Sequence, residues 1–210
     1  MKIYEKIISV VGLGYVGLPL AIELGKKFNV IGFDISKNRI LNLKKKIDLS
    51  KEITSNEFSK SKFLKFSFKK EDLKKSDIYI ITVPTPLKNN KKPDISYIIK
   101  ACDIIFKTIE KGNVIVLEST VYPGFCEEIL APYIEKKTGF LFNKDFFLGY
   151  SPERINPGNS KYKLKNIVKI VSASNKKTLN DLSFIYKSIV NAGIYKVKNI
   201  KIAESAKVIE

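Results

Sequence analysis

Short apolar runs alternate with amphipathic segments along most of the chain. The runs typical of buried strands are Ile7–Val11, Val30–Phe33, Ile78–Val83, Val114–Leu117, Phe146–Gly149, Ile167–Val171 and Tyr195–Val197, with Phe63–Phe68 a weaker candidate. Helical spacing predicts helices at Val16–Lys27, Lys37–Lys46, Ser96–Lys111, Glu127–Lys137 and Lys176–Val190, with Asp94 a plausible cap of the third, while Leu49–Ser61 stays ambiguous. Buried strands that alternate with helices predict an α/β fold with a doubly wound, mainly parallel sheet.

The last segment, NIKIAESAKVIE, also has helical spacing. No Gly, Asn or Pro follows that would end a helix there. We therefore expect one domain over residues 1–198 and the first turns of a long helix over residues 199–210. If further domains are absent, the side chains on this helix should form exposed apolar surface and lower solubility. Those side chains are Ile202, Ala203, Ala206 and Ile209.

The chain is strongly basic, with a formal net charge of +17 over 210 residues. A basic face is typical of proteins that bind nucleic acid. Here the lysines are scattered from end to end, and the arginines that would read bases are limited to Arg39 and Arg154. We therefore favour a solvated lysine surface and no nucleic-acid partner, and keep a nucleic-acid role as a distant alternative.

Two further classes of function are disfavoured by composition. The apolar run after MKIYEK imitates a signal peptide, yet it contains three glycines and Pro19 and is too short to cross a bilayer. Two cysteines, Cys102 and Cys126, favour a reducing compartment. The chain has no histidine, which removes Cys–His and Ser–His catalysis and most zinc sites. We expect a cytoplasmic protein with no membrane partner and no metal.

The first strand leads into VVGLGYVG, in which Gly12, Gly14 and Gly17 follow the spacing G-x-G-x-x-G. This pattern is weak alone, but here it follows a strand and opens a helix, and Asp34 comes at the end of the next strand. Together these features predict a Rossmann-type dinucleotide site, with phosphates at the helix N-terminus. The Asp34 carboxylate would accept bonds from the ribose hydroxyls and repel a 2′-phosphate, which favours NAD over NADP.

A plainer interpretation of the same residues is a glycine-rich turn that binds nothing, with Asp34 as a helix cap. The four elements in order favour the dinucleotide site over this alternative. Arg39 is less secure from spacing, because a single arginine on an exposed helix face is usually just solvated.

Three strand ends lead into loops that combine prolines with hydroxyl or charged side chains. These loops are ITVPTP, LESTVYPG and LGYSPERINPG. Ligands of open α/β sheets bind beyond the carboxyl ends of the strands, so we expect the loops to form a rigid polar rim near the nicotinamide. Each loop taken singly is also compatible with ordinary turn chemistry.

The segments GLGYVGLPLA, STVYPG, YSPERINPG and KIAESAKVIE resemble the NAD-binding half of the UDP-glucose/GDP-mannose dehydrogenase family. They look most like its UDP-N-acetylhexosamine 6-dehydrogenase branch, which includes enzymes of capsule and Vi-type polysaccharide synthesis. The resemblance implies oxidation of the sugar C6 alcohol to a carboxylate with two NAD per turnover. It also implies a homo-oligomeric enzyme with a long central helix and a UDP-sugar domain, both mostly outside this chain.

The resemblance also implies roles for individual residues. Cofactor contacts fall on Gly12, Gly14, Tyr15, Val16, Gly17, Asp34, Arg39, Thr85 and Thr120. Thr120 would also position substrate or water, Glu153 matches the general acid/base, and Lys207 matches the catalytic lysine, so these three form the expected catalytic set. Substrate contacts fall on Glu153, Arg154, Ile155 and Lys207. A lysine ammonium would stabilise the negative charge that develops on the sugar oxygen.

The second oxidation step in this family uses a cysteine thiolate, which forms a thiohemiacetal and then a thioester. Its glycine-rich motif would lie beyond residue 210, and Cys102 is expected to be a core residue. Cys126 sits at a helix start, where a dipole would lower its pKa, yet a structural role is favoured. The chain alone should not complete the oxidation.

Two other interpretations stay open at this point. One is a β-hydroxyacid dehydrogenase, which shares the glycine turn and a lysine on the helix between domains; STVYPG and SPERINPG argue against it. The other is a non-catalytic NAD-binding module. The identity of the sugar is not readable from these residues.

Overall fold

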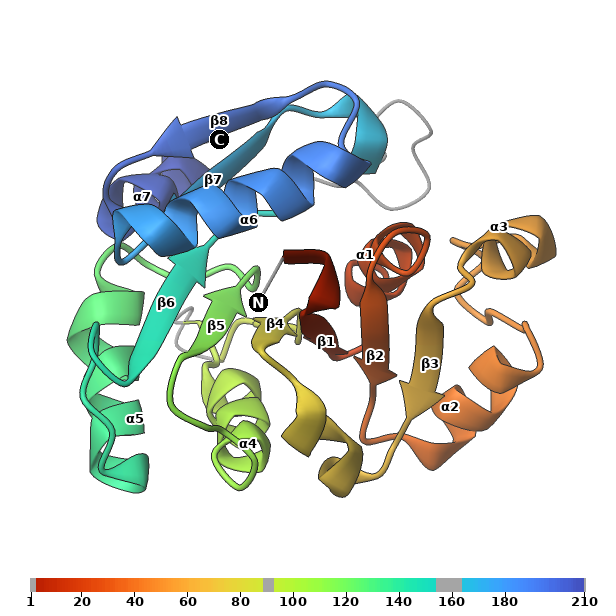
Figure 1. Ribbon diagram of the computed structural model, residues 1–210, viewed down its shortest axis with the longest axis horizontal. Helices are drawn as coiled ribbons and strands as arrows, with labels where there is room; N and C mark the ends of the chain where they lie inside the picture. The colour runs from red at the N-terminus through yellow and green to blue at the C-terminus, as the bar shows by residue number, and fades with distance from the viewer. Residues whose placement is uncertain (1–2, 89–92, 154–163, 210) are drawn as a thin grey trace.

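A computed structural model describes residues 3–88, 93–153 and 164–209. Its eight strands form one sheet in the order β3-β2-β1-β4-β5-β6-β7-β8 (Figure 1). The strands are β1 (Ile7–Val11), β2 (Asn29–Phe33), β3 (Leu64–Ser67), β4 (Ile78–Ile81), β5 (Asn113–Leu117), β6 (Phe146–Tyr150), β7 (Lys169–Ala173) and β8 (Ile194–Val197). The expected α/β, Rossmann-type doubly wound sheet is confirmed.

The central strands alternate between two hydrophobic clusters, because successive side chains of a strand point to opposite faces of the sheet. In β4, Ile78 and Ile80 join one cluster and Tyr79 and Ile81 join the other. All four side chains are buried. These strands are buried on both faces, which is why the sequence shows continuous apolar runs there.

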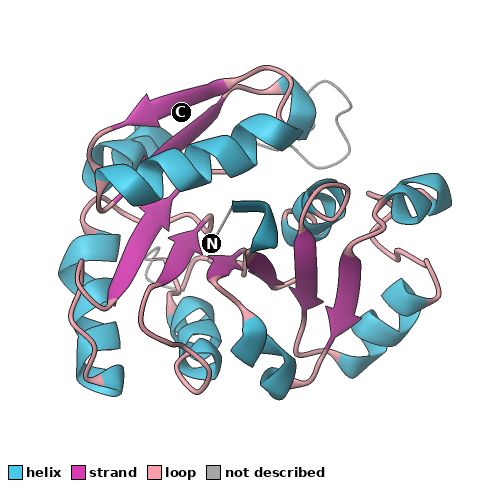
Figure 2. Ribbon diagram, in the orientation of Figure 1, coloured by secondary structure: helices cyan, strands magenta, loops and turns pink. Residues whose placement is uncertain are grey.

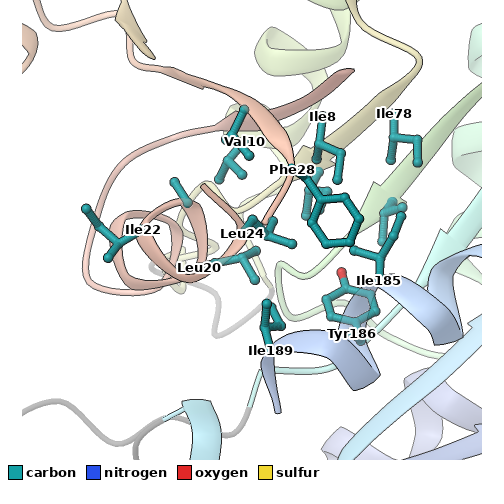
Figure 3. Close-up of a cluster of buried hydrophobic side chains, with 14 of the residues drawn as sticks. Ile8, Val10, Leu20, Ile22, Leu24, Phe28, Ile78, Ile185, Tyr186 and Ile189 are labelled. Atoms are coloured by element: carbon teal, nitrogen blue, oxygen red, sulfur yellow. The ribbon is translucent and has the colours of Figure 1, made fainter. Parts of the chain in front are cut away.

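Helices cover both faces of the sheet (Figure 2). On one face, α1 (Gly17–Leu24) and α6 (Lys176–Ile189) lie side by side, and Leu20, Leu24, Ile185 and Tyr186 pack together between them (Figure 3). On the other face, α4 (Ser96–Ile105) and α5 (Ala131–Thr138) supply the second cluster. β1, which leads into the glycine turn, is the third of the eight strands in the sheet, between β2 and β4.

One strand reverses the direction of the sheet. β7 pairs antiparallel with β6, with Gly149 opposite Ala173 and Tyr150 opposite Ser172, and β8 is parallel to β7. The other neighbouring strands are all parallel. The first residue of β7 therefore lies at the same edge as the carboxyl ends of β1, β4, β5 and β6.

Two predicted helices have bounds in the structure that differ by more than three residues from the prediction. The helix expected over Ser96–Lys111 ends at Ile105, whose carbonyl accepts the N–H groups of Thr108 and Ile109 in a closing turn. The expected cap, Asp94, is confirmed in part: its carboxylate accepts the Ser96 N–H at 3.0 Å, but the residue at the cap position is Ile95. The helix expected over Glu127–Lys137 begins as a π-helix, η3 (Phe125–Leu130), before α5. Pro132 lacks the N–H that an uninterrupted α-helix would require.

The ambiguous segment before β3 contains a short helix, α3 (Ser55–Lys60). Thr54 and Glu57 form a capping box: the Thr54 side chain accepts the Glu57 N–H, and the Glu57 carboxylate accepts the Thr54 N–H. α2 (Lys37–Lys44) precedes it, and the 3₁₀ turn η2 (Lys70–Lys75) follows β3. Single-turn 3₁₀ segments, η1 (Ile3–Glu5) and η5 (Leu164–Asn166), precede β1 and β7.

The last helix is α7 (Ile200–Ile209). Its first turn packs into the second cluster through Ile200 and Ala203, so the expectation that Ala203 is exposed is wrong. Ile202 and Ile209 are exposed, as predicted, at 59% and 86%, and Ala206 is half-buried. Across the described residues, no helix combines the length and apolar character needed to cross a membrane.

Candidate active site

The glycine turn after β1 is shaped by contacts that leave no room for side chains. Gly12 has φ +96°, a conformation that favours glycine. A Cβ on Gly17 would lie 1.9 Å from the Gly12 carbonyl oxygen and 2.4 Å from Thr82 Oγ1. Thr82 in turn donates to the Gly12 carbonyl at 2.6 Å, which joins the turn to the end of β4. Gly12 and Gly17 are therefore required by the fold itself.

Gly14 lies in different surroundings. A Cβ there would meet no heavy atom of the described residues within 4 Å, so the Gly14 backbone has an open face. α1 begins three residues later, and within the described chain its cap residue, Val16, makes no side-chain capping bond. The first N–H groups of a helix have no helical acceptors and carry its positive dipole end. This open turn fits the pyrophosphate of a dinucleotide.

Asp34, at the end of β2, is fixed by the same turn. Its carboxylate accepts the Leu13 N–H at 2.9 Å and the Ser36 N–H at 2.8 Å. The alternative that Asp34 caps a helix is wrong, because Ser36 caps α2 by accepting the Arg39 N–H. An ionised carboxylate has about four acceptor positions, so Asp34 retains capacity for ribose hydroxyls.

Arg39 is held on three sides and is not a freely solvated side chain. Its Nε donates to the Leu13 carbonyl at 3.1 Å, and its two terminal nitrogens donate to Asp48 at 2.7 Å and Ser50 at 3.1 Å. Burial raises the pKa of Asp48, but hydrogen bonds from Ser50 and Arg39 outweigh it and hold that pKa below its ordinary value. The planar guanidinium is thus fixed beside the glycine turn, where the adenosine end is expected.

A cavity of about 320 Å³ collects most of the predicted site residues from distant parts of the chain. It lies where four parallel strands end and where α7 passes over them. Its lining residues are Gly14, Tyr15, Val16, Thr82, Val83, Pro84, Thr85, Glu118, Ser119, Thr120, Glu153 and Lys207. Seven of these were predicted from the sequence, and they include Thr120, Glu153 and Lys207, the three expected catalytic residues.

The other predicted residues lie outside this cavity. Gly12, Gly17, Asp34 and Arg39 form or hold the adjoining glycine turn. Arg154 and Ile155 lie outside the residues that the structure describes. A larger cavity, about 790 Å³, lies at the sheet edge around β3 and contains none of the predicted site residues. The smaller cavity is therefore the candidate site.

Five cavity residues were missed by sequence reasoning, and two of them, Thr82 and Ser119, join the loops of the rim by hydrogen bonds. Ser119 donates from its hydroxyl to the Val83 carbonyl at 2.6 Å, joining the β5 and β4 loops, while the neighbouring Thr120 side chain is exposed. Thr82 joins the β4 loop to the glycine turn. A hydroxyl residue one or two positions after an apolar strand was the available signal for both.

A buried charged cluster adjoins the cavity. Lys169 Nζ lies 3.0 Å from Glu118 Oε2 and 3.2 Å from Glu153 Oε2, and Tyr186 donates its hydroxyl to Glu118 Oε1 at 2.5 Å. Burial raises the pKa of Glu118 to about 7, and the Lys169 ammonium limits this rise. The two carboxylates in turn raise the pKa of Lys169 against the effect of its burial, so we treat this ammonium as charged.

Glu204 holds α7 against the loop that carries Thr120. Its buried carboxylate accepts the Gly124 N–H at 2.6 Å and the Cys126 N–H at 2.9 Å, at the start of η3. A carboxylate is favourable at a helix N-terminus. Lys207 comes three residues later on α7 and so lies on the same side of this helix. Glu204 thereby fixes the helix turn that brings Lys207 to the cavity.

Neither cysteine offers a reactive thiolate. Cys102 and Cys126 are both buried and free of disulfides. Burial raises the pKa of the Cys102 thiol, and burial together with Glu204 raises that of Cys126. The idea that a helix dipole lowers the pKa of Cys126 is wrong here, because the Glu204 carboxylate already occupies that helix start.

Sequence comparison with known proteins identifies relatives that bind NAD through such a domain. Residues 6–190 match the sequence model described as UDP-glucose/GDP-mannose dehydrogenase family, NAD binding domain. The chain is 48% identical over 203 residues to the UDP-N-acetyl-D-glucosamine 6-dehydrogenase of Salmonella typhi, covering 97% of this chain and 48% of that protein. It is 47% identical over 203 residues to the CapL protein of Staphylococcus aureus, again covering 97% and 48%.

Solved structures give the same result. The structure of the UDP-D-ManNAc dehydrogenase of Pyrococcus horikoshii superposes with a TM-score of 0.87 at 31% identity, covering 97% of this chain and 49% of that one. The chain spans about half the length of the curated relatives it matches. The family resemblance predicted from the motifs is confirmed: the chain belongs to the UDP-glucose/GDP-mannose dehydrogenase family and comprises its NAD-binding domain.

Proposed function

We propose that this chain is the cofactor-binding part of an enzyme that oxidises the C6 alcohol of a UDP-N-acetylhexosamine to the carboxylate. The observation that supports this most is the cavity in which Thr120, Glu153 and Lys207 meet the glycine turn. Relatives at 47–48% identity include UDP-N-acetyl-D-glucosamine 6-dehydrogenases, which supports the substrate class. Homo-oligomerisation of the whole protein and a cytoplasmic location stay predictions from the sequence.

The cofactor contacts follow the geometry of the turn. The open face of Gly14 and the start of α1 take the pyrophosphate, and Asp34 and Arg39 take the adenosine end. NAD, when bound, supplies the hydride acceptor for the oxidation. Tyr15, Val16, Thr85 and Thr120 line the cavity and would surround its nicotinamide end.

The remaining residues act on the alcohol. A C–H bond gives up hydride readily only as its hydroxyl loses a proton, so a proton acceptor has to be at hand. Glu153 fits this role, directly or through water, and Lys207 would stabilise the developing negative charge on the oxygen. Thr120, with its exposed side chain, would orient the hydroxyl or a water. Arg154 and Ile155 stay predicted substrate contacts.

Two alternatives from the sequence are weighed differently now. Family membership disfavours the β-hydroxyacid dehydrogenase. A non-catalytic NAD-binding module shares the glycine turn and Asp34, but it has no use for a carboxylate and a lysine meeting at the nicotinamide end. Neither described cysteine supports a thioester step, since both thiols are buried.

The test is a calorimetric titration of the chain with NAD. Wild type is expected to bind saturably, and Asp34→Ala to bind at least tenfold more weakly, because the ribose loses its acceptor. Asp34→Asn keeps an acceptor for the Leu13 N–H. Weaker NAD binding by this variant would therefore come from the ribose contact and not from a disturbed glycine turn. Asp181→Ala is the matched control, since this α6 carboxylate pairs with Lys6. Equal NAD affinity in wild type and Asp34→Ala would refute the assigned cofactor site.

The catalytic assignment needs a separate readout. When the UDP-sugar domain of a family member is added to the NAD-bound chain, a UDP-N-acetylhexosamine should perturb the NMR signals of Lys207 and Glu153, and small hydroxyacids should not. Perturbation by hydroxyacids alone would revive the β-hydroxyacid alternative. NAD binding with no response to any nucleotide sugar, even when the UDP-sugar domain is supplied, would support the non-catalytic module.

A further inference from the structure

Lys169 is a lysine in the interior of the protein, with only 4% of its side chain exposed. Burying an ammonium group is costly unless opposite charges and hydrogen bonds compensate it. Two carboxylates do so here, and the ammonium also lies 5.2 Å from the Tyr186 ring centroid. No motif in the sequence draws attention to Lys169, and the proposed reaction does not use it directly.

The reversed strand explains how Lys169 comes to lie beside the cavity. β6 and β7 pair antiparallel, with Gly149 opposite Ala173 and Tyr150 opposite Ser172. When this register is continued past the end of β6, Glu153 falls opposite Lys169. Ser151 supports the continuation, because its hydroxyl donates to the Ile170 carbonyl at 2.6 Å. A parallel β7 would have put its first residue at the other edge of the sheet.

The two carboxylates differ in what surrounds them. Glu118 is buried, with one oxygen on Lys169 and the other on the Tyr186 hydroxyl, so it is fixed at both ends. Glu153 is partly exposed and lines the cavity together with Lys207 and Thr120. Lys169 therefore connects Glu118, which is bonded through both oxygens in the core, to Glu153, which lines the cavity.

We propose that Lys169 is a positioning residue for Glu153, holding its carboxylate at the cavity wall by a charge-assisted hydrogen bond that Glu118 and Tyr186 anchor from behind. This inference rests on the proposed function, because it assumes that Glu153 acts on the substrate proton. A merely structural Lys169 would instead join β7 to β5 through Glu118, and Glu153 would be incidental.

The two roles differ in how strongly the charges of Lys169 and Glu153 are coupled. A cation within hydrogen-bond distance favours the ionised form of a carboxylate, and a second carboxylate disfavours it. Removing the Lys169 ammonium should therefore make Glu153 easier to protonate. Burial raises the pKa of Glu118 to about 7, so Glu118 is largely protonated where a lysine-bound glutamate titrates, and Glu118→Gln should leave the Glu153 titration near its wild-type value. A structural role, in which the contact between Lys169 and Glu153 is not kept in solution, predicts no shift in Lys169→Met.

The experiment is an NMR pH titration of the 210-residue chain labelled with ¹³C at the glutamate carboxyl carbon. Glu153→Gln assigns the Glu153 signal. In Lys169→Met the titration midpoint of Glu153 should rise by at least one pH unit, a tenfold weaker acid, whereas in Glu118→Gln it should stay near the wild-type value. Lys169→Arg should restore most of the wild-type midpoint. Lys165→Met is the control, because Lys165 pairs with a different carboxylate, that of Glu23, at 3.1 Å and should leave Glu153 unchanged.

Each outcome decides the proposal. An unmoved Glu153 midpoint in folded Lys169→Met overturns it. If Lys169→Met fails to fold, the wild-type titration still decides, and a Glu153 midpoint at or above the ordinary glutamate value of about 4.3 overturns the proposal. The titration uses the chain without NAD. If the chain fails to bind NAD, the proposed function is refuted, but the charge coupling between Lys169 and Glu153 can still be measured.

Discussion

Gly14 and Gly17 lie three residues apart in the same turn, but the space around their Cα atoms differs: Gly17 is closely packed and Gly14 is open. A methyl group on Gly17 would collide with the Gly12 carbonyl and Thr82, and backbone atoms cannot yield cheaply. A methyl group on Gly14 would enter open space. The same substitution at these two positions therefore separates what the fold needs from what the cofactor needs.

We expect Gly17→Ala to lower the free energy of unfolding by about 2 kcal/mol, as overpacked sites do. We expect Gly14→Ala to unfold like wild type yet bind NAD at least tenfold more weakly, because its methyl group occupies the approach of the pyrophosphate. Urea unfolding and calorimetric NAD titration of both variants check this. A Gly14→Ala protein with wild-type affinity would show that the pyrophosphate lies elsewhere.

The charge of Asp34 carries a prediction about cofactor choice. Its carboxylate lies at the turn where the ribose is expected, so it should repel a 2′-phosphate. Wild type is expected to prefer NAD over NADP, and Asp34→Ser should narrow that preference at least tenfold while keeping a hydroxyl near the ribose. Competition of NADP against NAD in a fluorescence titration gives the ratio. An unchanged ratio would mean that Asp34 serves only to hold Leu13 and Ser36.

At the scale of elements, α7 is joined to the rest of the domain by two glutamates of very different surroundings. Glu204, on α7, is buried and accepts two backbone N–H groups of the η3 start. Glu128, on η3, pairs with Lys201 of α7 at 2.8 Å and is 63% exposed. Exposed ion pairs contribute little, whereas buried donors left without an acceptor are costly.

Glu204→Ala is therefore expected to lower the free energy of unfolding by about 2 kcal/mol or more, from two orphaned N–H groups. Glu128→Ala, its matched control, should change it by less than about 1 kcal/mol. Amide exchange at Gly124 and Cys126 should accelerate in Glu204→Ala alone. Slow exchange at both amides in that variant would show that α7 is held by its apolar contacts and that Glu204 is dispensable.

Features that depend on neighbouring residues were predictable from the sequence, and features that depend on residues far apart in the chain were not. The run Ile7–Val11 became β1 with the same bounds, since strand and turn signals are local. The reversal at β7 was not predictable, because an apolar run such as Ile167–Val171 carries no mark of its direction. The Glu153–Lys169 contact follows from that reversal. Glu118 lay within a quoted motif, but its burial depends on Lys169 and Tyr186, which come from other elements.

At the scale of the whole molecule, the cluster around Lys169 joins the parallel sheet to its reversed extension. Glu118 follows β5, Lys169 begins β7, and Tyr186 lies on α6, so all three elements share one buried contact. Burial raises the pKa of Glu118 from 4.5 to about 7. The folded protein thus holds a proton on Glu118 more readily than the unfolded chain does between these pH values.

The sign of the pH dependence follows from that difference. Where the folded state binds more protons, the free energy of unfolding falls as pH rises. The Glu118 contribution should fall between pH 4.5 and about 7, by order of 1 kcal/mol per pH unit, and stay level above that range. Urea unfolding measured across this range should show a flatter curve for Glu118→Gln than for wild type, with Glu128→Gln, an exposed carboxyl, following wild type. Parallel curves for all three proteins would mean that Glu118 is ionised throughout and that Lys169 compensates its burial completely.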